Sequence, residues 1–418
     1  MSHASVINPL SHFSPRSRSV SRRGLIVFTA TLLWLAGSIT RAADAPDVRH
    51  LTPEEISAGW VELFDGKTLS GWKSNSEINW SAQDGILQAD QGEKGLLLTK
   101  IPFADYELLC DVWIAKGGNS GIFLRTPFQP KSAATDCYEL NMCDTHPAFK
   151  TASLVEVAQP KKVVTGDGRW LRYHVVCQGN TVRVQVQNEL VLEHTDTRPA
   201  APRTGFIGLQ KNEGLVKFRN VFLKPAPMQP LFNGKDLTGW RVIPGGKSEF
   251  KVVDGAIQVL NGRGFLETEQ TWADFVLQAE VKTQGDKLNS GIFFRAQPGT
   301  AEAPSNGYEA QIHNAFKGTD RTAPVDFGTG AIYRRIPARR VVSNDREWFT
   351  LTLAAYGPQI SVWVNGEQVT DWVDARPPKE NPREGLRTSA GHLSLQGHDP
   401  TTNILFRKIR IVPVTGRE

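Results

Sequence analysis

Residues 308–314, Tyr-Glu-Ala-Gln-Ile-His-Asn, alternate strictly between apolar and polar side chains. Successive side chains of a β-strand point to opposite faces, so Glu309, Gln311 and His313 are expected on one face. A carboxylate, an amide and an imidazole in a row are poor core residues, because buried polar groups need hydrogen-bond partners. The pattern therefore predicts the floor of a polar cleft.

Two further segments, residues 289–295 and 393–399, carry the same alternation. In the first segment Asn289 and Arg295 share one face, and in the second Gln396 and His398 share one. If the three strands are neighbours in one sheet, their polar faces combine into a single candidate site. This site comprises Asn289, Arg295, Glu309, Gln311, His313, Gln396 and His398.

The elements that position these residues occur twice in the chain. Residues 63–72, LFDGKTLSGW, return as residues 231–240, LFNGKDLTGW. The motif Asn-Ser-Gly-Ile-Phe-Xaa-Arg occurs at residues 119–125 and again at 289–295. Because these and further matches keep their order, the sequence indicates an internal duplication.

Three prolines within residues 225–230 mark the boundary between the repeats, because proline cannot donate a strand hydrogen bond. We predict a first domain over residues 59–226 and a second over residues 227–418. Both contain short alternating strands between glycine-rich turns, and Asn365-Gly366 is typical of a hairpin turn. The pattern predicts an all-β fold of sandwich or jelly-roll type.

Residues 1–45 have the features of a signal peptide, with an arginine pair before an apolar run and small residues after it. The run of fifteen residues is shorter than the roughly 20 needed to span a membrane. We expect an exported protein, periplasmic or extracellular, by the general secretory or twin-arginine route, with an uncleaved anchor as the alternative. Residues 46–58 are predicted to be a linker that contains one short helix capped by Thr52.

The formal net charge of +5 comes from this amino-terminal segment. Residues 1–43 contain five arginines and no acidic residue, which leaves 43 basic against 43 acidic side chains elsewhere. The neutral remainder gives no electrostatic reason to expect nucleic acid or a membrane as partner. The four cysteines all lie in the first repeat, do not have zinc-site spacing, and could form disulfides in an exported protein.

Several motifs together resemble one protein family. They are the Leu-Phe-Xaa-Gly-Lys opening, the Asn-Ser-Gly-Ile-Phe and Tyr-Glu-Xaa-Gln strands, residues 330–333 (Gly-Ala-Ile-Tyr) and the closing Leu-Gln-Xaa-His. This set is similar to the 3-keto-glycoside lyase and hydratase domain, also called the 3-keto-disaccharide hydrolase domain, over about residues 59–225 and 228–414. The match is specific in the second repeat and looser in the first. It implies two concanavalin-like jelly-roll β-sandwiches in tandem, in an exported bacterial protein.

The resemblance implies a 3-keto-disaccharide or 3-keto-glucoside substrate, supplied by an upstream sugar 3-dehydrogenase. The C3 ketone acidifies the C2 hydrogen, so a base can remove it; the enolate then expels the C1 substituent and leaves a 2-hydroxyglycal that water can hydrate. Such a site needs a base, a donor for the enolate oxygen and an acid for the leaving group. Glu309, His313 and His398 are the proton-transfer candidates, with imidazole favoured as the base. Arg295 is the candidate oxyanion donor, and the candidate substrate ligands are Asn289, Gln311, Tyr333 and Gln396.

The repeats differ at the residues that matter most for this chemistry. The first has Cys143 and Asn212 where the second has His313 and His398. We therefore expect the reaction in the second repeat and a degenerate site in the first. No cofactor is expected, although a divalent metal held by Glu309, His313 and His398 is an alternative.

A non-catalytic, lectin-like carbohydrate-binding protein is the alternative from a different functional class, because a jelly roll does not fix function. Two imidazoles beside a carboxylate favour the enzyme. Hydrolysis of an unoxidised glycoside is disfavoured, because that chemistry usually needs two carboxylates across the bond and only Glu309 is evident.

Overall fold

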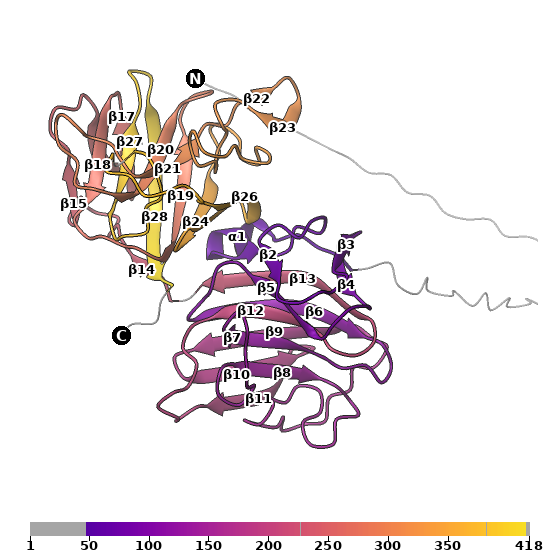
Figure 1. Ribbon diagram of the computed structural model, residues 1–418. Helices are drawn as coiled ribbons and strands as arrows, with labels where there is room; N and C mark the ends of the chain where they lie inside the picture. The colour runs from indigo at the N-terminus through magenta and orange to yellow at the C-terminus, as the bar shows by residue number, and fades with distance from the viewer. Residues whose placement is uncertain (1–46, 226, 382, 415–418) are drawn as a thin grey trace, which may run out of the picture. The chain divides into compact units, whose positions relative to one another are not determined.

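The computed structural model describes residues 47–225, 227–381 and 383–414, so the predicted signal peptide lies outside the described residues. Regular structure in these ranges is almost entirely β, as expected from the sequence (Figure 1). The one described helix is α1 (Pro53–Ala58). The described ranges thus contain no helix that is long and apolar enough to cross a membrane.

The first repeat forms an eight-stranded and a five-stranded antiparallel sheet. The larger has the order β11 (Glu189–Thr195), β10 (Thr181–Val186), β9 (Leu171–Gln178), β6 (Tyr106–Ile114), β13 (Val216–Pro225), β4 (Ile86–Ala89) and β3 (Ser81–Gln83), with β1 (Val61–Glu62) on β13. The smaller has the order β2 (Trp72–Ser74), β5 (Gly95–Thr99), β12 (Phe206–Lys211), β7 (Ser120–Thr126) and β8 (Tyr138–Met142).

The second repeat has the same pair of sheets in the same order, which confirms two β-sandwiches in tandem. Its larger sheet is β16 (Glu249–Val253), β17 (Ala256–Leu260), β28 (Asn403–Pro413), β19 (Phe275–Thr283), β24 (Phe349–Tyr356), β25 (Gln359–Val364) and β26 (Glu367–Val373), with β14 (Gln229–Pro230) on β28. The smaller sheet is β15 (Trp240–Val242), β18 (Gly264–Thr268), β27 (His392–Gly397), β20 (Ser290–Ala296) and β21 (Tyr308–Ile312).

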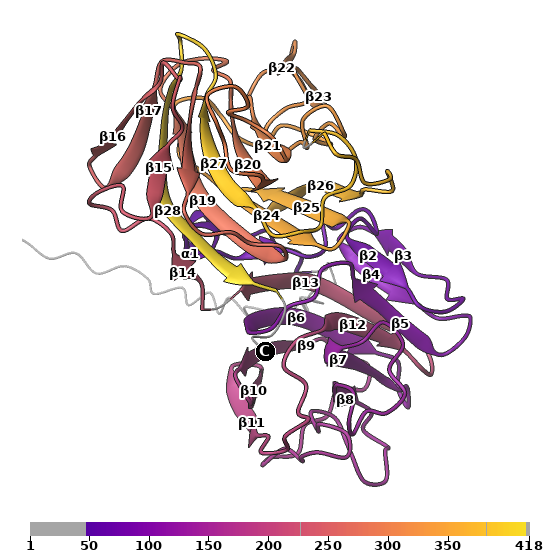
Figure 2. The same cartoon turned by 60° about the vertical axis from the view of Figure 1, so that its left-hand side comes forward.

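Among the described residues, only the second repeat adds a small hairpin, β22 (Phe316–Lys317) with β23 (Asp320–Pro324). This hairpin follows β21 directly and lies near it in both ribbon views (Figure 2). The chain after β23 returns to the edge of β21, where Ala310 pairs with Ile332. The first repeat makes the same return without the hairpin, where Leu140 pairs with Leu154, so the hairpin lengthens the segment between β21 and its edge.

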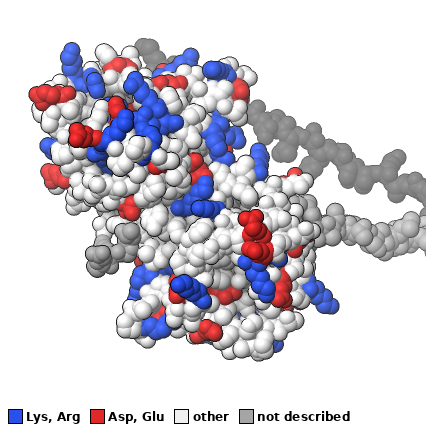
Figure 3. All heavy atoms as spheres, in the orientation of Figure 1, with Lys and Arg blue, Asp and Glu red and all other residues white. Residues whose placement is uncertain are grey.

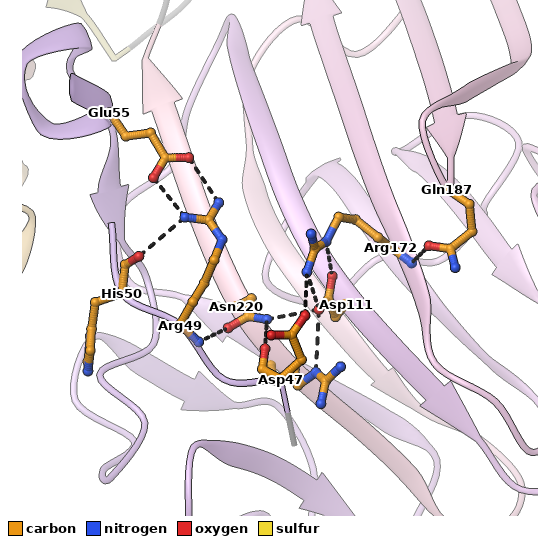
Figure 4. Close-up of polar contacts among 9 residues, drawn as sticks. Asp47, Arg49, His50, Glu55, Asp111, Arg172, Gln187 and Asn220 are labelled. Atoms are coloured by element: carbon orange, nitrogen blue, oxygen red, sulfur yellow. Dashed lines mark hydrogen bonds and ion pairs between the residues drawn. The ribbon is translucent and has the colours of Figure 1, made fainter. Parts of the chain in front are cut away.

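Within the segment predicted to be a linker, residues 46–58, the described residues contact the sandwiches. Helix α1 has the predicted cap, because Thr52 and Glu55 form a reciprocal capping box. Before the helix, the backbone N–H of Arg49 donates to Asn220, whose amide donates to the buried carboxylate of Asp111 (Figure 4). These polar groups of the predicted linker thus pair with the sheet of the first repeat.

The two sandwiches also share contacts and belong to one compact unit. Trp363 of β25 packs into the hydrophobic core of the first repeat, and its indole N–H donates to the carbonyl of Glu62 at 2.9 Å. Gln278 of β19 donates to the carbonyl of Gly59 at the end of α1. The second sandwich is thus anchored through its larger sheet, which leaves the five-stranded sheet to carry the candidate site.

Candidate functional site

The five-stranded sheet of the second repeat has one apolar and one polar face. Directly opposite residues of antiparallel strands share a face, and here Phe293 lies opposite both Glu309 and Ser394. In the next row Gly291 lies opposite Gln311. The predicted polar face is confirmed at these positions, while the alternate residues join the core: Ile292, Phe294, Tyr308, Ala310, Ile312 and Leu395.

Glu309 is the most chemically distinctive group on this face. Its residue is only 6% exposed, and this burial raises the pKa of its carboxyl to about 7. Within the described chain, no side chain or backbone N–H donates to the carboxylate, although its backbone carbonyl accepts from Tyr333. Gly291 leaves space for the carboxylate, because a Cβ at this position would lie 2.7 Å from Glu309 Oε1. The result is an unpaired carboxyl that gains and loses its proton near neutral pH.

Asp326 joins the site from the turn after the inserted hairpin. Its Oδ2 accepts hydrogen bonds from Asn289 Nδ2 at 2.7 Å and from Gln311 Nε2 at 3.0 Å. Both amides are thereby oriented, and their oxygens are left buried without partners, as is the amide oxygen of Gln396. Three unsatisfied acceptors on one face suit a ligand that carries hydroxyl donors. Sequence periodicity could not find Asp326, because it lies on a turn rather than on a strand.

The two candidate histidines are placed differently. His313 is buried, and its Nδ1 donates to the carbonyl of Leu288 at 3.3 Å, which leaves Nε2 as the acceptor of a neutral ring. His398 lies in the turn after β27 with its side chain 43% exposed, and its Nδ1 pairs with Asp399 at 2.8 Å. Among the described contacts, none joins the His398 ring to Glu309 or His313. His313 is thus a member of the polar sheet edge, whereas His398 lies outside the cleft floor.

Arg295 does not present its side chain on the polar face, which corrects the sequence-based expectation. A β-bulge interrupts the pairing of β20 between Phe293 and Ala296, and Arg295 adopts a φ of 50°. The bulge turns the side chain away from the polar face, and the guanidinium is completely buried. It donates to the carbonyls of Ala273, Gly357 and Arg387 and to the carboxylate of Asp274.

The edge of the polar face, called the rim below, carries Tyr333 and several arginines. Because Ala310 pairs with Ile332, Tyr333 lies opposite Glu309 at the edge of the sheet. The positive charges of Arg383, Arg334 and Arg263 oppose the effect of burial on the pKa of Glu309. A cationic rim is therefore available to stabilise negative charge where Arg295 cannot.

The metal alternative is not supported by the arrangement of side chains. In the described ranges, no three His, Cys, Asp or Glu side chains are placed to hold a metal ion. Glu309, His313 and His398 are thus not brought together as a ligand set. The four cysteines are buried as free thiols, so the disulfides considered from the sequence are not formed.

The family of the chain follows from a comparison with known proteins. Residues 59–224 and residues 227–412 each match the 3-keto-alpha-glucoside-1,2-lyase-like domain. The chain belongs to this family. Both sandwiches are covered almost end to end, which agrees with the duplicated sheets.

Several proteins are similar to one copy of this lyase-like domain. A 3-keto-disaccharide hydrolase of Bacteroides thetaiotaomicron is 25% identical over 46% of this chain and 86% of that protein. A crystal structure from Parabacteroides distasonis, provisionally assigned as a glycosyl hydrolase, is 21% identical with a TM-score of 0.38 and covers 43% of this chain and 100% of that one. A carbohydrate-binding module of Bacillus subtilis is 17% identical with a TM-score of 0.30, over 38% and 98% of the two chains.

The first lyase-like repeat keeps half of the site. Glu139 corresponds to Glu309, and burial likewise raises the pKa of its carboxyl to about 7. Unlike Glu309, it accepts a hydrogen bond from Gln210 at 3.2 Å. Arg125 repeats the buried arrangement of Arg295, with a φ of 52° and bonds to three carbonyls and Asp105. The arginine is thus a structural element of both repeats.

The raised pKa of Glu309 predicts that this lyase-like domain becomes less stable as its carboxyl ionises. Against the usual value of 4.5, the folded state binds the proton more tightly than the unfolded state, so stability is lost as the pH rises through about 7. Glu309→Gln should therefore stabilise the protein by up to about 3 kcal/mol at pH 8.5 and by much less at pH 4.5. Urea unfolding at both pH values tests this, with Glu269→Gln, at an exposed position that makes no ion pair among the described residues, as control. An equal effect of Glu309→Gln at both pH values would contradict it.

Proposed function

We propose that the second repeat cleaves 3-keto-glycosides by elimination across C1 and C2 and then hydrates the 2-hydroxyglycal, which together amount to hydrolysis. The observation that carries this proposal is Glu309, an unpaired carboxyl with a pKa of about 7 on the polar face of the sheet. Membership of the family supports a carbohydrate-active enzyme and a 3-keto sugar as substrate. Export remains our proposal for its location, with a C3-oxidising enzyme upstream.

In this mechanism Glu309 removes the proton from C2, and its pKa is suited to that step. A base is most effective when its pKa is near the working pH, because it is then largely ionised and still basic. The electron pair passes through the enolate and breaks the bond from C1 to its substituent. The protonated Glu309 can later return the proton to C2 while water adds to C1. One carboxyl thus acts as the base in the elimination and as the acid in the hydration.

The other roles follow from the placement of the remaining side chains. Arg334 lies next to Tyr333, beside Glu309. We propose that Arg334, rather than Arg295, stabilises the negative charge that develops on the enolate oxygen. His313 has a free Nε2 in its neutral form and is the candidate partner for the leaving group. The oxygens of Asn289, Gln311 and Gln396 are acceptors for sugar hydroxyls.

The proposal predicts turnover of a 3-keto-glucoside but not of its unoxidised parent. Purified residues 46–418 are incubated with nitrophenyl 3-keto-glucoside and nitrophenyl glucoside, and nitrophenol release is followed. In D₂O, the early product from the keto sugar should carry one deuterium at C2, because Glu309 exchanges its proton with solvent before returning it. Equal release from both glycosides without deuterium at C2 would indicate direct hydrolysis instead.

Carbohydrate binding without catalysis is the second candidate, and the first repeat favours it. That repeat has Cys143 in place of His313, and its buried carboxyl is held by Gln210. Sugar binding by the full chain without release from either glycoside would make this the function of the protein.

A further inference from the structure

We propose that the second repeat takes glycosides carrying an anionic group, a carboxylate or a sulfate ester, which Arg263 and Arg383 bind at the rim of the cleft. This inference uses the cleft of the proposed function but concerns binding, so it can be tested without catalysis. It defines a substrate class that the chemistry of elimination alone does not require.

Two arginines from distant parts of the chain meet at one serine above the cleft floor. Arg383, in the loop before β27, donates to Ser305 Oγ at 2.7 Å, and Arg263, just before β18, donates to the same oxygen at 3.3 Å. Their guanidinium carbons lie 5.7 Å from the ring centre of Phe293 and 5.9 Å from that of Phe265. The two cations are thus held together over the polar face of the sheet.

These two phenylalanines lie on the polar face of the sheet and not in the main core. Phe293 lies opposite Glu309, and Phe265 lies opposite Gln396. Their rings meet edge to face with centres 5.4 Å apart, and with Ile243 they form a separate small apolar cluster. Arginines positioned on this cluster therefore face the same space as the carboxyl of Glu309.

The three rim arginines make no ion pair in the part of the chain that the structure describes. Most arginines there pair with a carboxylate, as Arg376 does with Asp374. Arg263, Arg334 and Arg383 are among those that make no ion pair, although all three are close enough to Glu309 to act on its charge. Asp326 is already bonded to two amides. Several unpaired guanidiniums near one another repel, and a bound anion would relieve that repulsion.

The basic rim is a property of the second repeat and not of the fold. At the position of Arg263 the first repeat has Lys94, which pairs with Glu213 at 3.1 Å. At the position of Arg334 it has an acidic residue, Glu156, which raises the pKa of Glu139 further. Figure 3 shows a contiguous group of basic side chains on the visible face of the second repeat. At these two positions the first repeat thus has a lysine that is already paired and an acidic residue, in place of two unpaired arginines.

The number of cations exceeds what the reaction alone needs. An elimination develops one negative charge on the enolate oxygen, and Arg334 can stabilise that charge. Arg263 and Arg383 remain, and guanidinium groups bind carboxylates and sulfates through paired, charge-assisted hydrogen bonds. Neutral sugars have hydroxyls, which the amides of the cleft floor already match. A further anionic group on the glycoside is the ligand that fits the two remaining arginines.

Binding is measured with residues 46–418 by isothermal titration calorimetry at low and high salt. The probes are nitrophenyl glucoside, its glucuronide, its 6-sulfate and 4-carboxyphenyl glucoside, so the arms separate the kind and position of the anion. At least one anionic probe should bind at least tenfold more tightly than the neutral glucoside at low salt, and the preference should shrink at high salt. Equal or weaker binding of all three anionic probes would overturn the proposal.

Variants locate the site and provide the control. Arg263→Gln and Arg383→Gln should each remove most of the preference, with melting curves to verify folding. Lys94→Gln, at the matching position of the first repeat, should leave the preference unchanged. A preference that survives in the double variant would overturn the assignment to these arginines. Anion binding without turnover of any 3-keto-glycoside would support this inference and contradict the proposed reaction. Turnover of the neutral substrate with no anion preference would support the reaction and contradict this inference.

Discussion

Glu309→Gln should reduce the rate of C1-substituent release from a 3-keto-glucoside by about 10²- to 10⁴-fold, the usual contribution of a positioned acid–base group. Glutamine keeps the size of the side chain and can still fit against Gly291, but it cannot take up the C2 proton. The loss should fall mainly on kcat, because the amides that bind the sugar are unchanged. Nitrophenol release at saturating substrate measures it.

The pH dependence provides a second readout of the same assignment. The base must be ionised, so the rate of the unmodified protein should rise with pH and level off above about 7, where burial places the pKa of Glu309. The residual rate of Glu309→Gln should lack this step. If the rise of the rate with pH is unchanged in Glu309→Gln but absent in His313→Ala, the imidazole is the base.

The matched variant in the first repeat decides which cleft reacts. Glu139 is similarly buried and its pKa is raised to the same value, so Glu139→Gln makes the same chemical change at the corresponding position. If the second repeat carries the reaction, the rate should change by less than about twofold. A large loss in Glu139→Gln with an unaffected Glu309→Gln would place the reaction in the first repeat.

Strand periodicity predicted the polar face well, because the side chains of regular strands alternate strictly. Glu309 and Gln311 lie where a period of two puts them, and the apolar partners Ala310 and Ile312 are in the core. The same rule failed at Arg295, because a bulge with one residue at positive φ reverses the side-chain direction. Bulges depend on the pairing of neighbouring strands, which one strand's sequence does not encode.

Other features were hidden because they depend on distant parts of the chain. Asp326 meets Asn289 only after the inserted hairpin has folded back to the edge of β21. The raised pKa of Glu309 depends on burial by parts of the chain that are distant in sequence. Similarly, Arg263 and Arg383 are 120 positions apart and become neighbours only through Ser305. The sequence supplied the residue types, and tertiary contacts decided which of them face the cleft.

Arg295→Met should destabilise the second sandwich by about 3–5 kcal/mol, the range observed when one partner of a buried ion pair is removed. The change removes the charged partner of Asp274, which keeps the backbone N–H of Gly357, and takes the Arg295 donor from three backbone carbonyls. Arg295→Lys should recover little, because one ammonium cannot reach four acceptors that a planar fork reaches together. Urea unfolding and the kcat of the folded fraction are measured on the same samples.

The two possible roles of Arg295 give opposite results in this pair of measurements. A structural residue lowers the unfolding midpoint and leaves the kcat of the remaining folded protein within a fewfold range, whereas an oxyanion donor would lower kcat by about 10²-fold or more with an unchanged midpoint. Arg125→Met offers the matched case, because its bonds are the same and its repeat lacks both histidines. Similar destabilisation by both variants would show that the duplicated arginine holds the bulged strand in place, and that the oxyanion must be met by the cations of the rim.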